Sequence, residues 1–293
     1  DVGSADIKLN EDGIYILAIG AADMGTGCDT ILAQMVAECM MCPIENVVVS
    51  GADTDTSPYD SGSYASSTTY ITGRAVEKAC GKLQERIVQE AAKILNCDSG
   101  ELEFAGDCVK RLATGEEVSL TQIGTSSMCG SINALEAVED SSSPVSPPPF
   151  MAGMVEIELD KETGHVEVLD YVAVVDCGTV INPNLARVQV EGGLVQGIGM
   201  ALYENIQYSP KGQLRNNSLM QYKVPTRLDM GKLRVEFESS YEPTGPFGAK
   251  SIGEIVINTP SPALAHAIYN ATGLWFRELP ITSEKIAMGL LKK

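Results

Sequence analysis

One carboxylate at the end of a glycine-rich stretch is the residue of this sequence best placed for acid–base chemistry. The stretch Gly245–Glu254 contains three glycines and one proline, and Thr259-Pro260 then predicts the start of a helix. Glycine is used where the backbone takes a positive φ or approaches another group closely. Desolvation among such backbone and apolar neighbours would raise the pKa of Glu254 and suit it to general-base catalysis. The alternative is structural, because a helix dipole also favours a carboxylate near a helix N-terminus.

Two other stretches could bind an anionic group. Gly20–Thr30 is a glycine-rich turn between a predicted strand and a predicted helix, an arrangement whose backbone N–H groups can bind an anion. It matches neither the G-x-G-x-x-G fingerprint nor the P-loop, so a capped turn is the alternative. The hydroxyl-rich segment Asp53–Thr69 also leads into a helix, and its alternative is a solvated loop.

Composition excludes several classes of function. The 293 residues carry a net charge of −18, which argues against nucleic acid and anionic membrane surfaces as partners. The sequence has no apolar run of the roughly 20 residues that span a membrane, and it begins without a signal-peptide pattern. Two histidines give little support to a histidine-rich metal site or a Ser-His-Asp triad. Cys39 and Cys42 lack a second pair at metal-site spacing, so we expect free thiols, no metal held by side chains, and a cytoplasmic protein.

The elements that must position these residues follow from periodicity and turn signals. The Ser/Pro run 141–149 can be neither helix nor central strand, and it indicates a boundary between two subdomains, 1–145 and 146–293. We predict an α+β fold in which each subdomain has a mixed or antiparallel sheet and packed helices. The expected elements are hairpins over 7–19 and 152–175, a strand over 46–50, short strands within 97–120, a short helix starting within 119–122, extended segments over 221–225 and 233–239, and helices over 31–41, 70–95, 184–203, 259–272 and 282–291.

The predicted helix over 184–203 is unusual because it contains several glycines. Each glycine costs a helix up to about 1 kcal/mol relative to alanine, so another group is expected to pack against this backbone. Gln189, Gly193 and Gln196 fall on one face at helical spacing.

Taken in order, the segments resemble the C-terminal half of the molybdopterin-binding subunit of the xanthine dehydrogenase family of molybdenum hydroxylases. The matching segments are 23–27, 63–69, 160–164, 176–183, 189–197 and 248–254. The loop over 53–69 looks nearest to anaerobic bacterial members such as nicotinate dehydrogenase and 4-hydroxybenzoyl-CoA reductase. In nicotinate dehydrogenase the molybdenum subunit is split between two polypeptides, which suits a 293-residue chain carrying the second half.

The resemblance implies roles for individual residues. Glu254 would be the catalytic base, and Gln189 would hydrogen-bond the pterin, with the glycine helix allowing close approach of its backbone to that flat group. The residues expected to bind the cofactor are Met24, Gly25, Thr26 and Gly27 near the dithiolene and pyrophosphate, and Ala65, Ser66 and Thr68 at its phosphate or nucleotide part. The sequence departs from the family at two places: Thr26 replaces a usual Gln, and Ile255-Val256 replace a proline pair.

The resemblance also implies an activity and partners. The activity would be hydroxylation of an N-heterocycle such as nicotinate, with oxygen from water and hydride passing to a terminal sulfido or selenido ligand of molybdenum. The cofactor would be molybdopterin in its cytosine dinucleotide form, with FAD and [2Fe-2S] clusters on partner subunits and the other half of the cofactor site on an N-terminal-half molybdopterin subunit. The alternatives are a xanthine or aldehyde dehydrogenase, a 4-hydroxybenzoyl-CoA reductase-type enzyme, or a non-catalytic subunit that stores or assembles the cofactor.

Overall fold

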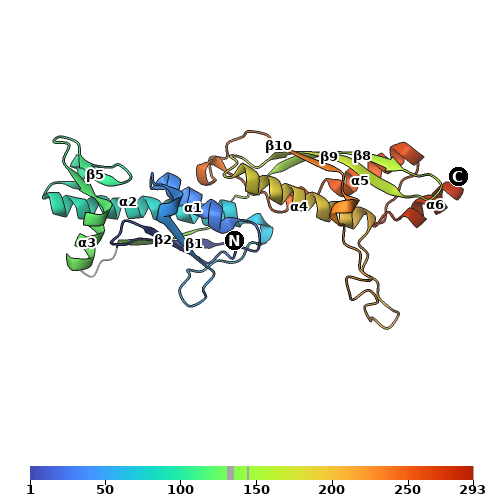
Figure 1. Ribbon diagram of the computed structural model, residues 1–293, viewed down its shortest axis with the longest axis horizontal. Coiled ribbons are helices and arrows are strands. Elements are labelled where there is room, and N and C mark those ends of the chain that lie inside the picture. Colours follow the sequence, from blue (N-terminus) through green and yellow to red (C-terminus); the bar gives the residue numbers. More distant parts are fainter. Residues whose placement is uncertain (131–134, 144, 293) are drawn as a thin grey trace. The chain divides into compact units, whose positions relative to one another are not determined.

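A computed structural model describes residues 1–130, 135–143 and 145–292 (Figure 1). Packing divides the chain into two compact units. The first contains Asp1–Pro147 and Tyr241–Ser251, and the second contains Pro148–Ser240 and Ile252–Lys293. The chain therefore returns once to the first unit before its last helices. None of the helices in the described residues is both long and apolar enough to cross a bilayer.

The first unit is built on a four-stranded sheet with the order β3-β2-β1-β7. Its strands are β1 (Gly3–Leu9), β2 (Tyr15–Ile19), β3 (Val47–Gly51) and β7 (Glu136–Ser141). β1 pairs antiparallel with β2 and β7, whereas β2 pairs parallel with β3, so the sheet is mixed as predicted. We did not predict β7: its sequence EAVEDS is poor in β-formers, and pairing with β1 makes it a strand.

Helices cover this sheet on the face where its apolar residues point. α2 (Gly73–Leu95) packs on β1 and β7, and α1 (Cys28–Cys39) packs against α2. In β2 every second residue is buried, which is the period that places Tyr15, Leu17 and Ile19 in the core. α1 begins three residues earlier than the sequence predicted, at the end of the glycine-rich turn.

A smaller antiparallel sheet and one helix follow α2 in the first unit. The strands are β4 (Leu102–Phe104), β5 (Cys108–Arg111) and β6 (Glu117–Ser119), and α3 spans Leu120–Gly130. The short strands expected between residues 97 and 120 are thus confirmed. Short 3-10 helices also occur in the chain, at Ile44–Asn46, Tyr64–Ser66, Ser99–Glu101, Arg227–Asp229, Pro246–Gly248 and Ile255–Ile257, together with a π-helix at Thr68–Thr72.

The second unit has a three-stranded sheet with the order β10-β9-β8, covered by helices (Figure 1). The strands are β8 (Phe150–Leu159), β9 (Val166–Asp176) and β10 (Lys232–Phe237), and the helices are α4 (Pro183–Leu202), α5 (Pro260–Thr272) and α6 (Ser283–Leu291). β8 and β9 form the predicted hairpin, and β10 lies parallel to β9 after a crossover through α4. Residues 221–225, expected to be extended, form no strand. The core packs Tyr171, Ala173 and Val175 of β9 against α4 and α5.

A long arm joins α4 to β10 in the second unit. Asn205–Leu228 is exposed apart from Ser209, Asn216, Tyr222 and Pro225, and Figure 1 shows it extending away from the end of α4. Its base is fixed where the Tyr222 hydroxyl donates to Glu204 Oε2 at 2.6 Å. The arm is therefore a largely exposed projection anchored at its base.

Candidate functional site

Glu254 lies at the N-terminus of the short helix Ile255–Ile257, with an exposed side chain. The described residues of the second unit therefore do not shield the carboxylate from water as the sequence hypothesis supposed. The backbone beside it is held, because Gln189 Nε2 of α4 donates to the carbonyl oxygen of Gly253 at 3.5 Å. Two predicted site residues, Gln189 and Glu254, are thus brought to adjacent positions in the second unit.

The glycines of α4 accommodate the segment that follows Glu254. A Cβ built on Gly193 would lie 2.1 Å from Val256 Cγ2, and one on Gly197 would lie 2.7 Å from Pro260 Cγ. Our interpretation of these glycines as a surface for a flat pterin is therefore wrong at Gly193 and Gly197. Their role is to let α4 pack tightly against the Glu254 turn and the start of α5. Gly192 differs, since a Cβ there would meet no atom within 4 Å.

The glycine-rich stretch that ends in Glu254 is divided between the two units. Its first part belongs to the first unit, where the Tyr70 hydroxyl lies 2.6 Å from Thr244 Oγ1 and Gly73 packs against Pro246. Phe247 and Gly248 both take positive φ values, 51° and 83°, which turn the chain sharply. The stretch therefore connects the units, and Glu254 stands just after the crossing into the second.

The loop containing Met24, Gly25, Thr26 and Gly27 is organised by Asp23. Its carboxylate accepts hydrogen bonds from the backbone N–H groups of Gly25 at 2.9 Å and Gly27 at 3.1 Å, and of Asp29 at 3.4 Å. Partial burial raises the pKa of Asp23, but these hydrogen bonds outweigh it and hold the pKa below its ordinary value. The N–H groups that we expected to bind an anion at the start of α1 thus donate to the Asp23 carboxylate in this structure.

The hydroxyl-rich loop has an unusual backbone at two predicted cofactor residues. Ala65 and Ser66 both have positive φ, 51° and 60°, although neither is glycine. The loop is fixed by the Thr68 hydroxyl, which donates to Ser63 Oγ at 2.8 Å, and by Asp60, whose carboxylate accepts from Gly62 N–H and from the Thr72 hydroxyl. Backbone strain of this kind is concentrated at ligand-binding sites. Asp60 was missed from the sequence, although an Asp two residues before a glycine is a turn signal.

The two cofactor loops meet at the end of β2. A Cβ built on Gly20, at the start of the first loop, would lie 2.4 Å from the carbonyl oxygen of Pro58 and 2.8 Å from Asp60 Cβ. Glycine at position 20 is therefore required by the contact between the loops. The sequence showed two separate candidate cradles, and the fold of the first unit places them side by side.

Two cysteine-containing clusters lie in the first unit. Cys28 Sγ lies with Asp23 and Asp29 oxygens within 4.8 Å of one another, but burial and these two carboxylates raise the pKa of the Cys28 thiol to about 11. Cys80 approaches the Cys39-x-x-Cys42 pair, where a hydrogen bond with Cys39 and burial raise the pKa of Cys80. All eight cysteines are free thiols.

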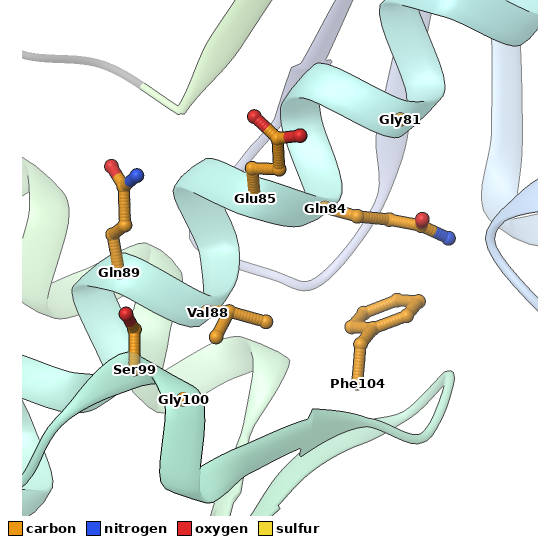
Figure 2. Close-up of a pocket in the computed structure, with 8 residues that line it drawn as sticks. All are labelled: Gly81, Gln84, Glu85, Val88, Gln89, Ser99, Gly100 and Phe104. Atoms are coloured by element: carbon orange, nitrogen blue, oxygen red, sulfur yellow. The ribbon is translucent and has the colours of Figure 1, made fainter.

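The structure also has an open pocket of about 530 Å³ between α2 and the small sheet. Figure 2 shows Val88 of α2 pointing toward Phe104, with Gln84, Glu85 and Ser99 around the rim. None of the predicted site residues lines it. The side-chain amide of Gln84 already makes a hydrogen bond within the protein, because its Nε2 donates to the Cys39 carbonyl oxygen. We therefore do not assign the pocket to the cofactor or the substrate.

Comparison with known proteins identifies the family. Residues 1–231 match the family model of the molybdopterin cofactor-binding domain. The chain belongs to this family. It is 36% identical over its whole length to the probable hypoxanthine oxidase XdhD of Escherichia coli, of which it covers 31%, and 32% identical over 96% of its length to the 6-hydroxypseudooxynicotine dehydrogenase complex subunit gamma of Paenarthrobacter nicotinovorans, of which it covers 36%.

A solved structure agrees with the sequence relatives. Quinoline 2-oxidoreductase from Pseudomonas putida 86 superposes with a TM-score of 0.90 at 26% identity, over 100% of this chain and 38% of that one. The predicted resemblance and the α+β fold are thus confirmed. The chain spans about a third of the length of the relatives it matches.

The residues in the two loops have the chemistry that a phosphate-linked pterin cofactor requires. The loop over 60–68 offers serine and threonine hydroxyls on a fixed, positive-φ backbone, and the adjoining loop over 24–27 is exposed around Met24. Hydroxyl groups are usual partners of phosphate oxygens, whereas the Gly25 and Gly27 N–H groups of the other loop bond to Asp23. A cofactor that carries its own metal ligands needs no thiolate cluster from the protein, so the residues present fit the group.

Proposed function

We propose that this chain is the C-terminal part of the molybdopterin-binding subunit of a molybdenum hydroxylase acting on an N-heterocycle such as nicotinate. The observation that carries the proposal is the Glu254 turn: an exposed carboxylate stands on a backbone that Gln189 holds from α4. The relatives named for hypoxanthine and quinoline support a heteroaromatic substrate. A xanthine or aldehyde dehydrogenase and a 4-hydroxybenzoyl-CoA reductase-type enzyme are the alternatives within the family.

In this proposal the first unit binds the phosphate-bearing part of the cofactor, in its cytosine dinucleotide form. The hydroxyls of Ser66 and Thr68 donate to phosphate oxygens, and Thr68 gives up its hydrogen bond to Ser63 Oγ to do so. Ala65 contributes the turned backbone that presents them. Met24, Gly25, Thr26 and Gly27 contact the pterin near its dithiolene and pyrophosphate. Gln189 donates its amide N–H to Gly253, so its amide oxygen can accept a pterin N–H.

Glu254 performs the proton transfer. When bound, the molybdenum cofactor supplies the oxygen-transfer chemistry and takes up two electrons. The Glu254 carboxylate accepts the proton of the attacking oxygen as that oxygen approaches the electrophilic ring carbon. Since Glu254 is exposed in this chain, the surface that excludes water from it must come from the partner half of the subunit.

Replacing Glu254 with glutamine tests the assignment of the base. Glutamine keeps the shape of the side chain and one acceptor oxygen but cannot accept the proton. We expect the purified complex to keep its molybdenum and pterin content while kcat falls by about 10²–10⁴-fold, the usual contribution of a positioned base. Metal analysis and steady-state kinetics on the same preparation provide the measurement. Substantial turnover by Glu254→Gln would remove this residue from the mechanism.

The rival proposal is a subunit that stores or assembles the cofactor. An experiment on the wild-type complex distinguishes it from a hydroxylase. A hydroxylase is reduced by its substrate and reoxidised by an acceptor. When nicotinate, purines and aldehydes are added in turn, one of these compound classes should therefore change the absorbance or the electron paramagnetic resonance spectrum of the molybdenum centre. A storage subunit holds molybdenum and responds to none of them. The same panel decides between an N-heterocycle and an aldehyde as substrate.

Surface composition supports the proposed partners. Met154 of β8 and Val174 of β9 are 67% and 37% exposed on the outer face of their sheet, and Leu219 and Met220 of the arm exceed 80%. Large apolar side chains this exposed are available to pack against a partner. We propose that an N-terminal-half molybdopterin chain covers it, and that FAD and [2Fe-2S] subunits of a cytoplasmic complex remove the electrons.

A further inference from the structure

The turn that carries Glu254 is held to α4 at three points. Before the carboxylate, Gln189 Nε2 donates to the Gly253 carbonyl oxygen. After it, the Val256 side chain, 1% exposed, lies over Gly193, and Pro260 lies over Gly197. Glu254 is therefore the exposed residue between two fixed flanks.

The contact at Gly193 is the closest of the three. A Cβ on Gly193 would lie 2.1 Å from Val256 Cγ2, 2.8 Å from Val256 Cβ and 3.2 Å from the Val256 carbonyl carbon. The last two atoms belong to or adjoin the backbone, so no change of rotamer at Val256 could make room. Any side chain at position 193 must push the turn away from α4, and Glu254 is two residues from the point of contact.

We propose that Gly193 is a positioning residue for the proposed reaction: its missing side chain sets how closely the Glu254 turn sits on α4, and hence where the carboxylate points. The inference rests on the proposed role of Glu254 as base. A displacement of about 1 Å at a reacting group can lower the rate by roughly 10²-fold even when the substrate still binds. Gly193 thus acts on catalysis through the position of Glu254.

The same helix provides a matched control. Gly192 is the neighbouring residue of α4, and a Cβ there would meet nothing within 4 Å. Alanine at either position improves helix propensity by a similar amount. Gly192 is exposed and Gly193 is buried, and of the two substitutions Gly193→Ala alone collides with Val256.

The experiment compares both variants in the assembled complex with its partner subunits. For Gly193→Ala we expect kcat to fall by about 10- to 100-fold, with KM and molybdenum content close to the wild-type values. Amide hydrogen exchange over residues 252–258 should be faster, because the Ile257 and Asn258 N–H groups bond within this turn, to the carbonyls of Glu254 and Ile255. Gly192→Ala should keep the wild-type hydrogen exchange over residues 252–258, because it leaves the contact with Val256 unchanged. The double variant Gly193→Ala/Val256→Ala should recover part of kcat, since it removes the closest atom but leaves Cβ at 2.8 Å.

The outcomes separate this inference from the proposed function. Wild-type kcat in Gly193→Ala, or loss of kcat only in proportion to lost molybdenum, would overturn the positioning role. Unchanged hydrogen exchange over 252–258 would do the same. If Glu254→Gln retains turnover, the base assignment fails, and the exchange comparison between the two alanine variants still decides whether Gly193 seats the turn.

Discussion

Asp6 illustrates how a single buried residue responds to its surroundings. It lies on β1 with a side chain only 13% exposed, and its Oδ1 is buried without a hydrogen-bond partner among the described residues. Burial, followed by the neighbouring Glu136 carboxylate of β7, raises the pKa of Asp6 to about 6, although Lys8 opposes the shift. The folded protein therefore prefers the protonated form of Asp6 more than the unfolded chain does.

The sign of this shift makes a prediction about pH. A raised carboxyl pKa stabilises the fold fully below the unfolded value near 4, and the contribution is lost as pH rises through about 6. Asp6→Asn, which cannot ionise, should therefore lose less stability than the wild type between pH 5 and pH 7.5. At pH 7.5 the free energy of unfolding of Asp6→Asn should exceed that of the wild type by roughly 1–2 kcal/mol, after allowance for the opposite pKa shift at Glu136. Thermal unfolding across this pH range is the measurement.

The control for this prediction is Asp12→Asn, which removes the same charge from an exposed position in the turn after β1. Its stability should follow the wild-type pH dependence. Parallel curves for the wild type and Asp6→Asn would contradict the assignment of the raised pKa to Asp6.

The hydroxyl-rich loop shows strain at the scale of an element. Residues 60–68 are fixed by hydrogen bonds at both ends, and between them Ala65 takes a left-handed conformation that a side chain disfavours. Glycine adopts this conformation without steric cost. The loop therefore keeps a shape that is locally unfavourable, and the proposed phosphate site provides a reason for it.

Ala65→Gly tests this strain directly. We expect the substitution to raise the free energy of unfolding by about 0.5–1 kcal/mol, because relief of the left-handed strain exceeds the extra entropy of an unfolded glycine. Ala113→Gly, in an exposed turn of ordinary backbone, should instead lower it slightly. The denaturant midpoints of both variants provide the measurement. A loss of stability in Ala65→Gly would show that the left-handed conformation is not strained here.

At the scale of the whole molecule, the arm differs in charge from the chain as a whole. Asn205–Leu228 contains four basic residues and no acidic one, in a chain whose net charge is −18. Its exposed apolar residues include Leu228, which is 97% exposed. A positively charged, apolar projection is suited to an acidic partner surface with an apolar centre.

The predicted consequence is that this chain is incomplete by itself. Expressed alone, it should be free of cofactor, inactive and prone to self-association through its exposed apolar surface. Co-expression with the N-terminal-half chain and the electron-transfer subunits should restore molybdenum binding, through an interface above about 2,000 Å² in total. Size-exclusion chromatography with metal analysis provides the measurement. A solitary, monodisperse chain that binds molybdopterin and turns over a heterocycle would refute the prediction.

A charge-reversal pair sharpens this test. Lys211→Glu/Arg215→Glu on the arm should weaken assembly by about tenfold or more at low salt, because like charges then face the acidic partner. Lys161→Glu, in the exposed turn between β8 and β9, changes one charge away from the arm and should assemble normally. Equal assembly of both variants would mean that the arm is not part of the interface.

The sequence alone determined most of the local elements and the family. Helices such as α2 are marked by apolar residues at helical spacing, and the β8–β9 hairpin by alternation around a turn, because these patterns depend only on neighbouring residues. Motifs spread from residue 20 to beyond residue 250 identified the molybdopterin-binding family, since several short motifs in one order are specific together. Glu254 and Gln189 were singled out in the same way.

Only the tertiary structure decided what depends on contacts between distant residues. β7 is a strand because β1 offers it a pairing edge, and its own composition gives no such signal. Gly193 is required by Val256, which is 63 positions away, so the sequence could show that a glycine was unusual but not what it faces. The division of Gly245–Glu254 between two units, and the exposure of Glu254, likewise follow from packing, which no local pattern contains.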